Sequence, residues 1–186
     1  MKTRKGFVQG LNAQAVTTEQ QIIAAEDVTQ EENDKQQLHP MLEQTESNRK
    51  AVGIKEETGV ALADAGYCSE ENFTKRTAGD VELLVAVQKD YKQRKAMQDQ
   101  PPPEEPIPDD LSPTGSMERK LLTERGRKLY KLRGQTVEPV FGQIKDARGF
   151  DKFMRRGIEA CQSEWSLICA THNLLKLWRS GKACWN

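Results

Sequence analysis

The stretch Tyr130-Lys-Leu-Arg-Gly-Gln-Thr-Val-Glu-Pro-Val-Phe-Gly-Gln-Ile-Lys145 decides how the rest of the chain is interpreted. Its apolar residues recur at helical spacing and form one side of a short segment: Val137, Val140, Phe141 and Ile144. Glu138 stands at the start of this segment. Pro139 directly after it suits the first position of a helix, where the missing N–H has no cost. The sequence therefore predicts a helix that begins near Glu138 and holds its carboxylate in a fixed place.

Positive charge is concentrated around this acid. Between Met117 and Arg156 there are 12 Lys and Arg against 5 Asp and Glu, a net charge of +7 in a chain whose total is zero. A basic block beside an acid is what a site for a polyanion requires, and Arg133 and Lys145 would steer a phosphate backbone. The alternative is a solvated basic helix face with no ligand.

The residues after Lys145 make the pattern more specific. They include Gly149-Phe150, Phe153-Met154-Arg155-Arg156-Gly157, Glu164-Trp165 and His172-Asn173-Leu174. With the first stretch they closely resemble the C-terminal part of bacterial insertion-sequence DDE transposases, whose third catalytic acid lies in a Tyr-Arg-Glu-Lys signature. The resemblance implies that Glu138 is that acid. It also implies DNA-facing roles for Tyr130, Arg133, Lys145, Arg155 and Arg156.

Asp64 is the second acid of interest. It follows the apolar run from Gly59 to Ala63, which predicts a buried parallel strand, and α/β sheets place functional groups at such strand ends. The motif Ala63-Asp64-Ala65-Gly66-Tyr67, followed by Ser69-Glu70-Glu71-Asn72, is similar to the block that carries the second acid of these transposases. The alternative is an Asp that only binds turn amides.

The order of predicted elements indicates an α/β fold. Residues 1–96 contain a hairpin (7–16 with 21–29), a helix around Leu38–Leu42, the strand that ends at Asp64, a helix capped by Ser69 and a strand over 81–87. Six of the eight prolines fall in 97–116, which predicts an extended acidic linker. Residues 117–186 form a basic helical part with helices over 117–130 and 153–178. The resemblance implies an RNase H-like mixed sheet with flanking helices, N-terminally truncated and with a Pro-rich insertion.

The family's chemistry explains why Asp64 and Glu138 would have to meet. In-line displacement at phosphorus suits two metal ions about 4 Å apart, and Mg²⁺ takes only a few carboxylates from the protein. The resemblance thus implies that Asp64 and Glu138 are catalytic metal ligands for Mg²⁺, or for Mn²⁺ in its place. The implied partners are DNA at the element ends and target, and a second copy of the chain or a full-length transposase.

Two features depart from the family pattern. Four residues separate Arg133 from Glu138, where the signature usually has three. The family's first Asp precedes a hairpin that Phe7–Ala15 resembles, but the six residues before Phe7 include no acid, and Asp27 and Asp34 follow it. We therefore expect a fragment that is inactive alone. The alternatives are a non-catalytic DNA-binding or regulatory remnant, and an unfolded product whose sheet has an exposed edge.

Composition sets the remaining expectations. The four cysteines show no CxxC pair, no apolar run approaches about 18 residues, and no signal peptide follows Met1, so we expect a cytoplasmic protein with reduced thiols. Cys161, Cys169, His172 and His39 do not match a zinc spacing, and core packing is the stronger interpretation. Trp165 and Trp178 are expected in the core, with base stacking as the alternative.

Overall fold

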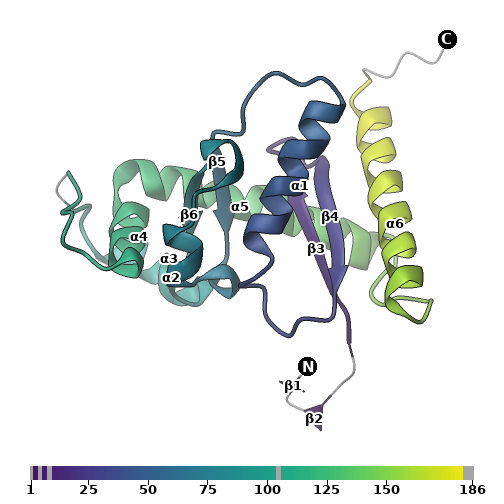
Figure 1. Ribbon diagram of the computed structural model, residues 1–186, viewed down its shortest axis with the longest axis horizontal. Helices are drawn as coiled ribbons and strands as arrows, with labels where there is room; N and C mark the ends of the chain where they lie inside the picture. The colour runs from purple at the N-terminus through teal and green to yellow at the C-terminus, as the bar shows by residue number, and fades with distance from the viewer. Residues whose placement is uncertain (1, 4–5, 8–9, 104–105, 182–186) are drawn as a thin grey trace. The chain divides into compact units, whose positions relative to one another are not determined.

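The computed structural model describes residues 2–3, 6–7, 10–103 and 106–181. The chain divides into two compact units, which are described separately (Figure 1). The first consists of Met1–Glu32 with Gly134–Asn186, and the second of Asn33–Arg133. Both contain strands and helices, so the predicted α/β class is confirmed. The segment 97–116, predicted as a linker, lies within the second unit.

The first unit is built on an antiparallel hairpin. β3 (Asn12–Thr17) pairs with β4 (Ile23–Thr29), as the sequence predicts, with a register shift between Val16 and Thr17. The expected strand start at Phe7 is wrong, because β2 (Gly6–Phe7) pairs with β1 (Lys2–Thr3) instead. The intervening Val8 and Gln9 lie outside the described residues. α6 (Ile158–Arg179) packs along β4 (Figure 1).

The core of the first unit forms between the hairpin and α6. Its buried residues are Ile23, Val28, Val140, Ile144, Cys161, Trp165, Ile168 and Cys169. The Trp165 ring stacks on Phe141 with centroids 5.9 Å apart, meets the edge of Phe153, and its Nε1 donates to the Gln14 carbonyl at 2.9 Å. Core packing is therefore confirmed for Trp165. It is wrong for Trp178, which is 65% exposed near the end of α6.

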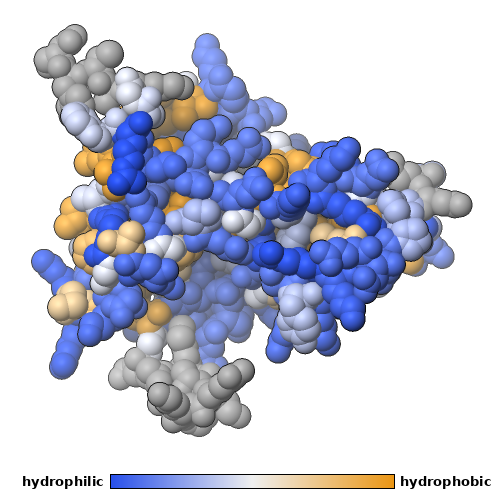
Figure 2. All heavy atoms as spheres, turned by 180° about the vertical axis from the view of Figure 1, so that it is seen from behind, coloured by the Kyte–Doolittle hydropathy of each residue, from blue (hydrophilic) through white to orange (hydrophobic). Residues whose placement is uncertain are grey.

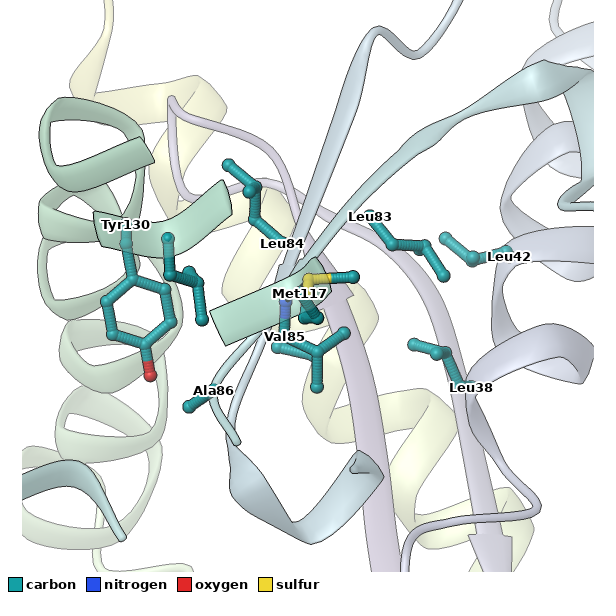
Figure 3. Close-up of a cluster of buried hydrophobic side chains, with 10 residues drawn as sticks. Leu38, Leu42, Leu83, Leu84, Val85, Ala86, Met117 and Tyr130 are labelled. Carbon is teal, nitrogen blue, oxygen red and sulfur yellow. Dashed lines mark hydrogen bonds between the residues drawn. The ribbon is translucent and has the colours of Figure 1, made fainter. Parts of the chain in front are cut away.

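The second unit surrounds two short parallel strands. β5 (Val60–Ala63) pairs with β6 (Glu82–Val85), so that Ala63 lies opposite Val85. The strands are flanked by α1 (Leu38–Ala51), α2 (Glu70–Thr74), α3 (Asp90–Asp99) and α4 (Pro113–Leu122). Leu84, Val85 and Leu121 are fully covered in the core, which also includes Leu38 and Tyr130 (Figure 3). Both predicted strands and the parallel orientation are confirmed, but β5 is only partly buried, since three of its four residues keep intermediate exposure.

Local sequence signals account for the helix starts in this unit. The Ser69 hydroxyl accepts from the Asn72 N–H and caps α2, as predicted. Ser112 caps α4 in the same way, and Pro113 takes the first helical position. Pro40 falls in the first turn of α1, where proline is tolerated. Since α3 extends to Asp99 and α4 begins at Pro113, the extended Pro-rich segment is shorter than predicted.

The helices of the C-terminal part differ from the prediction. The chain turns at Thr123, and one helix, α5 (Glu124–Gly142), continues through Pro139 to a π-helical turn over Gln143–Ala147. The predicted helix start at Glu138 is therefore wrong. α6 begins at Ile158 instead of Phe153, because Gly157 has a φ of +87°, which a helix does not accept.

The surface is mostly polar. In the space-filling view, hydrophilic residues cover most of the visible face and apolar residues appear as scattered spots (Figure 2). None of the described helices combines the length and the apolar character needed to cross a bilayer. The described cysteines, Cys68, Cys161 and Cys169, are free thiols, and Cys184 lies outside the described residues.

A glycine controls the junction between α4 and α5. A Cβ on the buried Gly126 would lie 2.1 Å from the Lys120 carbonyl oxygen and 2.9 Å from the Leu121 Cα, both of them backbone atoms that cannot move aside. We expect Gly126→Ala to lower the free energy of unfolding by about 1–3 kcal/mol, as overpacking does. Gly115→Ala, inside α4, should change it by less than about 1 kcal/mol. Urea unfolding of the two variants tests this, and equal losses would contradict the assigned backbone contact.

An ion-pair cluster at the start of β6 predicts a pH dependence. The hydrogen bond from Arg125 is the main cause that lowers the pKa of Glu82 from 4.5 to about 2; partial burial opposes it and Lys120 adds to it. Because the folded pKa lies below the unfolded one, this stabilisation is complete above the unfolded pKa and is lost as pH falls toward 2.

We therefore expect Glu82→Gln to lower the free energy of unfolding by about 1 kcal/mol at pH 7. The difference from wild type should shrink between pH 5 and pH 3 in urea titrations. Glu43→Gln, at an exposed position of α1, is the control and should show no such trend. A Glu82→Gln deficit that stays constant down to pH 3 would contradict the depressed pKa.

Candidate active site

Asp64 lies at the carboxyl end of β5 in the second unit. It caps a 3₁₀ turn over Ala65–Tyr67, and its Oδ1 accepts from the Gly66 N–H at 2.8 Å. The carboxylate is therefore bound to a turn amide, which was the alternative to a functional role. Its position is also the predicted one, because parallel β5 and β6 end at the same edge and the chain leaves β6 there toward Asp90.

A second carboxylate lies beside Asp64. A Cβ built on Gly66 would be 2.8 Å from Asp34 Oδ2 and 2.9 Å from Asp64 Oδ1, so both oxygens border the space that glycine leaves open. Burial raises the pKa of the neighbouring Tyr67 hydroxyl, and the charges of Asp34 and Asp64 raise it further. Asp34 follows the hairpin in sequence and is not among the predicted site residues. Gly66 was the only local signal that another group comes close here.

Tyr130 and Arg133 lie in the same unit, on the first turns of α5. Tyr130 is 4% exposed, and its hydroxyl has no hydrogen-bond partner among the residues that the structure describes. Burial raises the pKa of this hydroxyl, Arg133 opposes the rise, and the charges of Asp90 and Asp64 add to it. The Arg133 guanidinium, from a residue 9% exposed, donates to Asp90 Oδ1 at 3.0 Å. Both side chains are thus largely covered, whereas the sequence analysis expects them to face DNA.

Glu138 belongs to the first unit. It lies on α5 directly before Pro139 and is exposed. Lys145 is also exposed, in the π-helical turn, with its Nζ 5.2 Å from the centre of the Phe141 ring. Asp64 and Glu138 therefore belong to different units. Their approach to a common metal site stays a prediction.

Arg155 and Arg156 are exposed on the loop that leads into α6. The Glu164 carboxylate, on the second turn of α6, accepts from the Met154 N–H at 2.9 and 3.1 Å and from the Arg155 N–H at 3.0 Å. The Cys161 thiol donates to the Arg155 carbonyl at 3.3 Å. Glu164 is part of the family pattern without a predicted role, and in the structure its carboxylate holds the loop that carries the two arginines.

Eleven of the twelve cations of the basic block fall into two groups, and the twelfth, Arg119, is partly buried on α4. One group holds the fold, since each member contacts a carboxylate, hydroxyl or carbonyl of its own unit: Lys120, Arg125, Arg127, Arg133 and Arg148. The second group is exposed: Lys128, Lys131, Lys145, Lys152, Arg155 and Arg156. Net charge therefore overstates the number of cations that are exposed and outside such contacts, since Arg125 is exposed but paired with Glu82. The second group is the one that we assign to a polyanion.

The carboxylates of the candidate site are chemically suited to a hard cation such as Mg²⁺. Carboxylate oxygens are the ligands that Mg²⁺ prefers, and one or two of them with waters are its usual protein share. Asp34 and Asp64 offer such oxygens in one unit, and Glu138 in the other. Within the described ranges no three His, Cys, Asp or Glu gather as a metal site.

The two histidines considered as zinc ligands contact backbone carbonyls instead. The His172 Nε2–H donates to the Gln21 carbonyl at 2.9 Å, and the His39 Nε2 contacts the Asn72 carbonyl.

Comparison with known proteins agrees with the motif analysis. A family model described as "Transposase DDE domain" matches residues 1–174. The matched range includes Asp64, Glu138, Lys145 and the Arg155–Arg156 loop. No curated protein and no solved structure matches the chain.

The contacts of Glu164 predict a protected loop. Glu164→Gln replaces the charged acceptor of the Met154 and Arg155 N–H groups by a neutral amide with one accepting oxygen, so the charge-assisted contacts weaken and the loop over 153–157 should open more often. We expect trypsin to cut after Arg155 and Arg156 about five- to tenfold faster than in wild type, by the population of the open form. Glu159→Gln, exposed in the first turn of α6, is the matched control. Unchanged cleavage in mass-spectrometric time courses would contradict the anchoring role.

Proposed function

We propose that this chain, which belongs to the transposase DDE domain family, binds DNA and serves in the cutting and joining of phosphodiesters during DNA transposition. The observation that carries the proposal is the family match over residues 1–174, which spans both candidate acids. Asp64 at the carboxyl end of the parallel strand β5 supports it, because this is where α/β folds present functional groups.

Asp64 and Glu138 are the proposed metal ligands. Two Mg²⁺ ions, or Mn²⁺ in their place, would supply activation of the attacking oxygen and stabilisation of the leaving oxygen when bound. Asp64 is presented by the turn that follows β5, and Glu138 by the exposed side of α5. The proposal requires that the two units bring these carboxylates together in an RNase H-like arrangement. It also requires one of two things of Asp64. Its Oδ1 exchanges the Gly66 N–H for a metal ion, or Oδ1 keeps the Gly66 N–H while Oδ2 binds the metal ion.

DNA binding is assigned to exposed cations of the first unit. Lys145, Arg155 and Arg156 are exposed there, and the Glu164 contacts fix the loop that carries the two arginines. Tyr130 and Arg133 receive a supporting role. The buried Tyr130 ring packs in the core of the second unit and the Arg133 guanidinium pairs with Asp90, so both fix the position of α5. Tyr130 and Arg133 would then support DNA binding indirectly, by fixing α5.

A non-catalytic role is the second candidate. The exposed cations do not depend on the acids for their position, and the sequence supplies two of the three acids that the family's motif uses. We therefore propose that the chain alone does not cut DNA. Its binding to element ends, or to a full-length transposase, would regulate transposition.

Neutralising the arginine loop tests DNA binding. The double variant Arg155→Gln/Arg156→Gln should weaken binding to a 40-bp duplex about tenfold and lower the slope of log K against log salt by about 2, as two lost phosphate contacts predict. The matched control is Lys55→Gln/Lys75→Gln, which removes the same charge at exposed positions of the second unit. Fluorescence anisotropy between 50 and 200 mM NaCl measures both. Equal losses in the two double variants would reject the assigned surface.

Nicking of supercoiled plasmid in Mg²⁺ or Mn²⁺ separates the two candidate functions. The chain alone should nick no faster than its Asp64→Asn and Glu138→Gln variants, while all three bind duplex DNA equally. Metal-dependent nicking that both substitutions abolish would show that the chain is catalytic by itself, and would reject the purely regulatory role.

A further inference from the structure

The helix that carries Glu138 contains a local defect. Pro139 lies inside α5, and a proline has no N–H to donate to the carbonyl of the residue four positions earlier. That carbonyl belongs to Gln135, one turn before Pro139. A carbonyl left without its helical partner weakens the turn around it, and this turn includes Glu138.

Gln21 supplies the missing donor. Its side-chain Nε2 donates to the Gln135 carbonyl oxygen at 2.8 Å, across a separation of 114 residues in sequence. Both residues belong to the first unit. The hydrogen bond is therefore a tertiary replacement for the helical bond that Pro139 cannot make.

The Gln21 side chain is held from its other end as well. Its Oε1 accepts from the Lys176 Nζ at 2.9 Å, which orients the amide so that the NH₂ group faces Gln135. Its backbone carbonyl accepts from the buried His172 Nε2 at 2.9 Å. Gln21 thus links the tip of the β3–β4 hairpin to both α5 and α6.

The backbone at Gln21 is unusual for this residue type. Its φ is +64°, in the left-handed region that non-glycine residues seldom adopt. Contacts of the hairpin tip hold it there, since the Gln21 N–H donates to the Thr18 carbonyl at 2.8 Å and the Thr18 N–H donates to the Ile22 carbonyl at 2.9 Å. A surface groove of about 620 Å³ opens beside this point, with Gln21, Pro139 and Lys176 in its lining.

We propose that Gln21 is a positioning residue for Glu138. By donating to the Gln135 carbonyl it closes the defect at Pro139 and fixes the turn of α5 from which the Glu138 carboxylate projects. The catalytic importance of this turn depends on the proposed function, whereas the structural link between Gln21 and Pro139 does not.

The link predicts a rescue. Gln21→Glu keeps the stem and the contact with Lys176, but its carboxylate cannot donate to the Gln135 carbonyl. We expect amide hydrogen exchange at Val140, Phe141 and Gly142 to become about tenfold faster, because the turn opens more often. Adding Pro139→Ala restores an N–H that can donate to the Gln135 carbonyl, so exchange in the double variant should return to within about twofold of wild type.

Two comparisons keep the result specific. Gln20→Glu adds the same charge at the exposed neighbouring residue and should leave these amides unchanged. Amides of α1, in the other unit, report any global loss of stability. The inference is overturned if Gln21→Glu does not accelerate exchange, or if Pro139→Ala does not reverse the effect, since a general role of Gln21 in the hairpin would not respond to a change in α5.

A separate signal tests the proposed function. Paramagnetic broadening of the Glu138 amide by Mn²⁺ should occur in wild type, weaken in Gln21→Glu and recover in the double variant. Absence of broadening in wild type, together with the exchange and rescue pattern above, would reject the metal role of Glu138 and leave the Gln21–Pro139 link standing. Broadening that is equal in all variants would reject the positioning role.

Discussion

The missing N–H of Pro139 is the constraint on which the first unit depends. A helix that must continue through a proline needs an outside donor for one carbonyl, and this requirement ties α5 to a hairpin at the far end of the sequence. The same hairpin is joined to α6, because Asn173 accepts from the Ile23 N–H and donates to its carbonyl, each at 2.8 Å. The hairpin, the second half of α5 and α6 therefore form one unit although the first lies more than a hundred residues from the others. Hydrophobic contacts of Trp165, Val140 and Ile144 fill the space that these polar links define.

Some cations of the basic block stabilise the fold, and others remain exposed. A run of twelve cations would attract a polyanion if every member faced solvent, but a folded chain also needs donors for its own carbonyls and carboxylates. Arg127 donates to the carbonyls of Leu122 and Gln100 and thereby closes the Pro-rich segment against the start of α5. Arg148 does the same for the carbonyl of Ile168 and the hydroxyl of Thr171. Fewer cations are therefore available to a polyanion. Two of them, Arg155 and Arg156, lie on the loop whose backbone is held by Glu164.

Sequence patterns predicted those features that depend on local chemistry. The apolar run before Asp64, the Ser69 cap and the hairpin were all recoverable, because strand burial, capping and alternation are properties of neighbouring residues. The break at Thr123 was not predicted, although the close approach of Gly126 to the Lys120 and Leu121 backbone is local, because a lone glycine inside a helical pattern does not by itself mark a turn. Pro139 misled the prediction for a related reason. Proline normally marks a helix start, and only the distant Gln21 shows why the helix can pass through it. Trp178 has the helical spacing of a core residue, yet it is 65% exposed, although Lys176, two residues earlier, still contacts the hairpin tip.

In the candidate site too, contacts between residues distant in sequence could not be predicted. Family motifs singled out Asp64 and Glu138, and the structure places each of them at the end or on the exposed side of a regular element. No pattern pointed to Asp34, which reaches Asp64 only because the chain between the hairpin and α1 passes the Gly66 turn. Its position matters for the mechanism, because two neighbouring carboxylates in one unit repel each other and gain from a shared cation. Under the proposed function, a cation bound at the Asp64 edge would relieve this repulsion within the second unit. The Gln21 contact at the Pro139 turn belongs to the first unit alone, and there it fixes the backbone of the turn that carries Glu138.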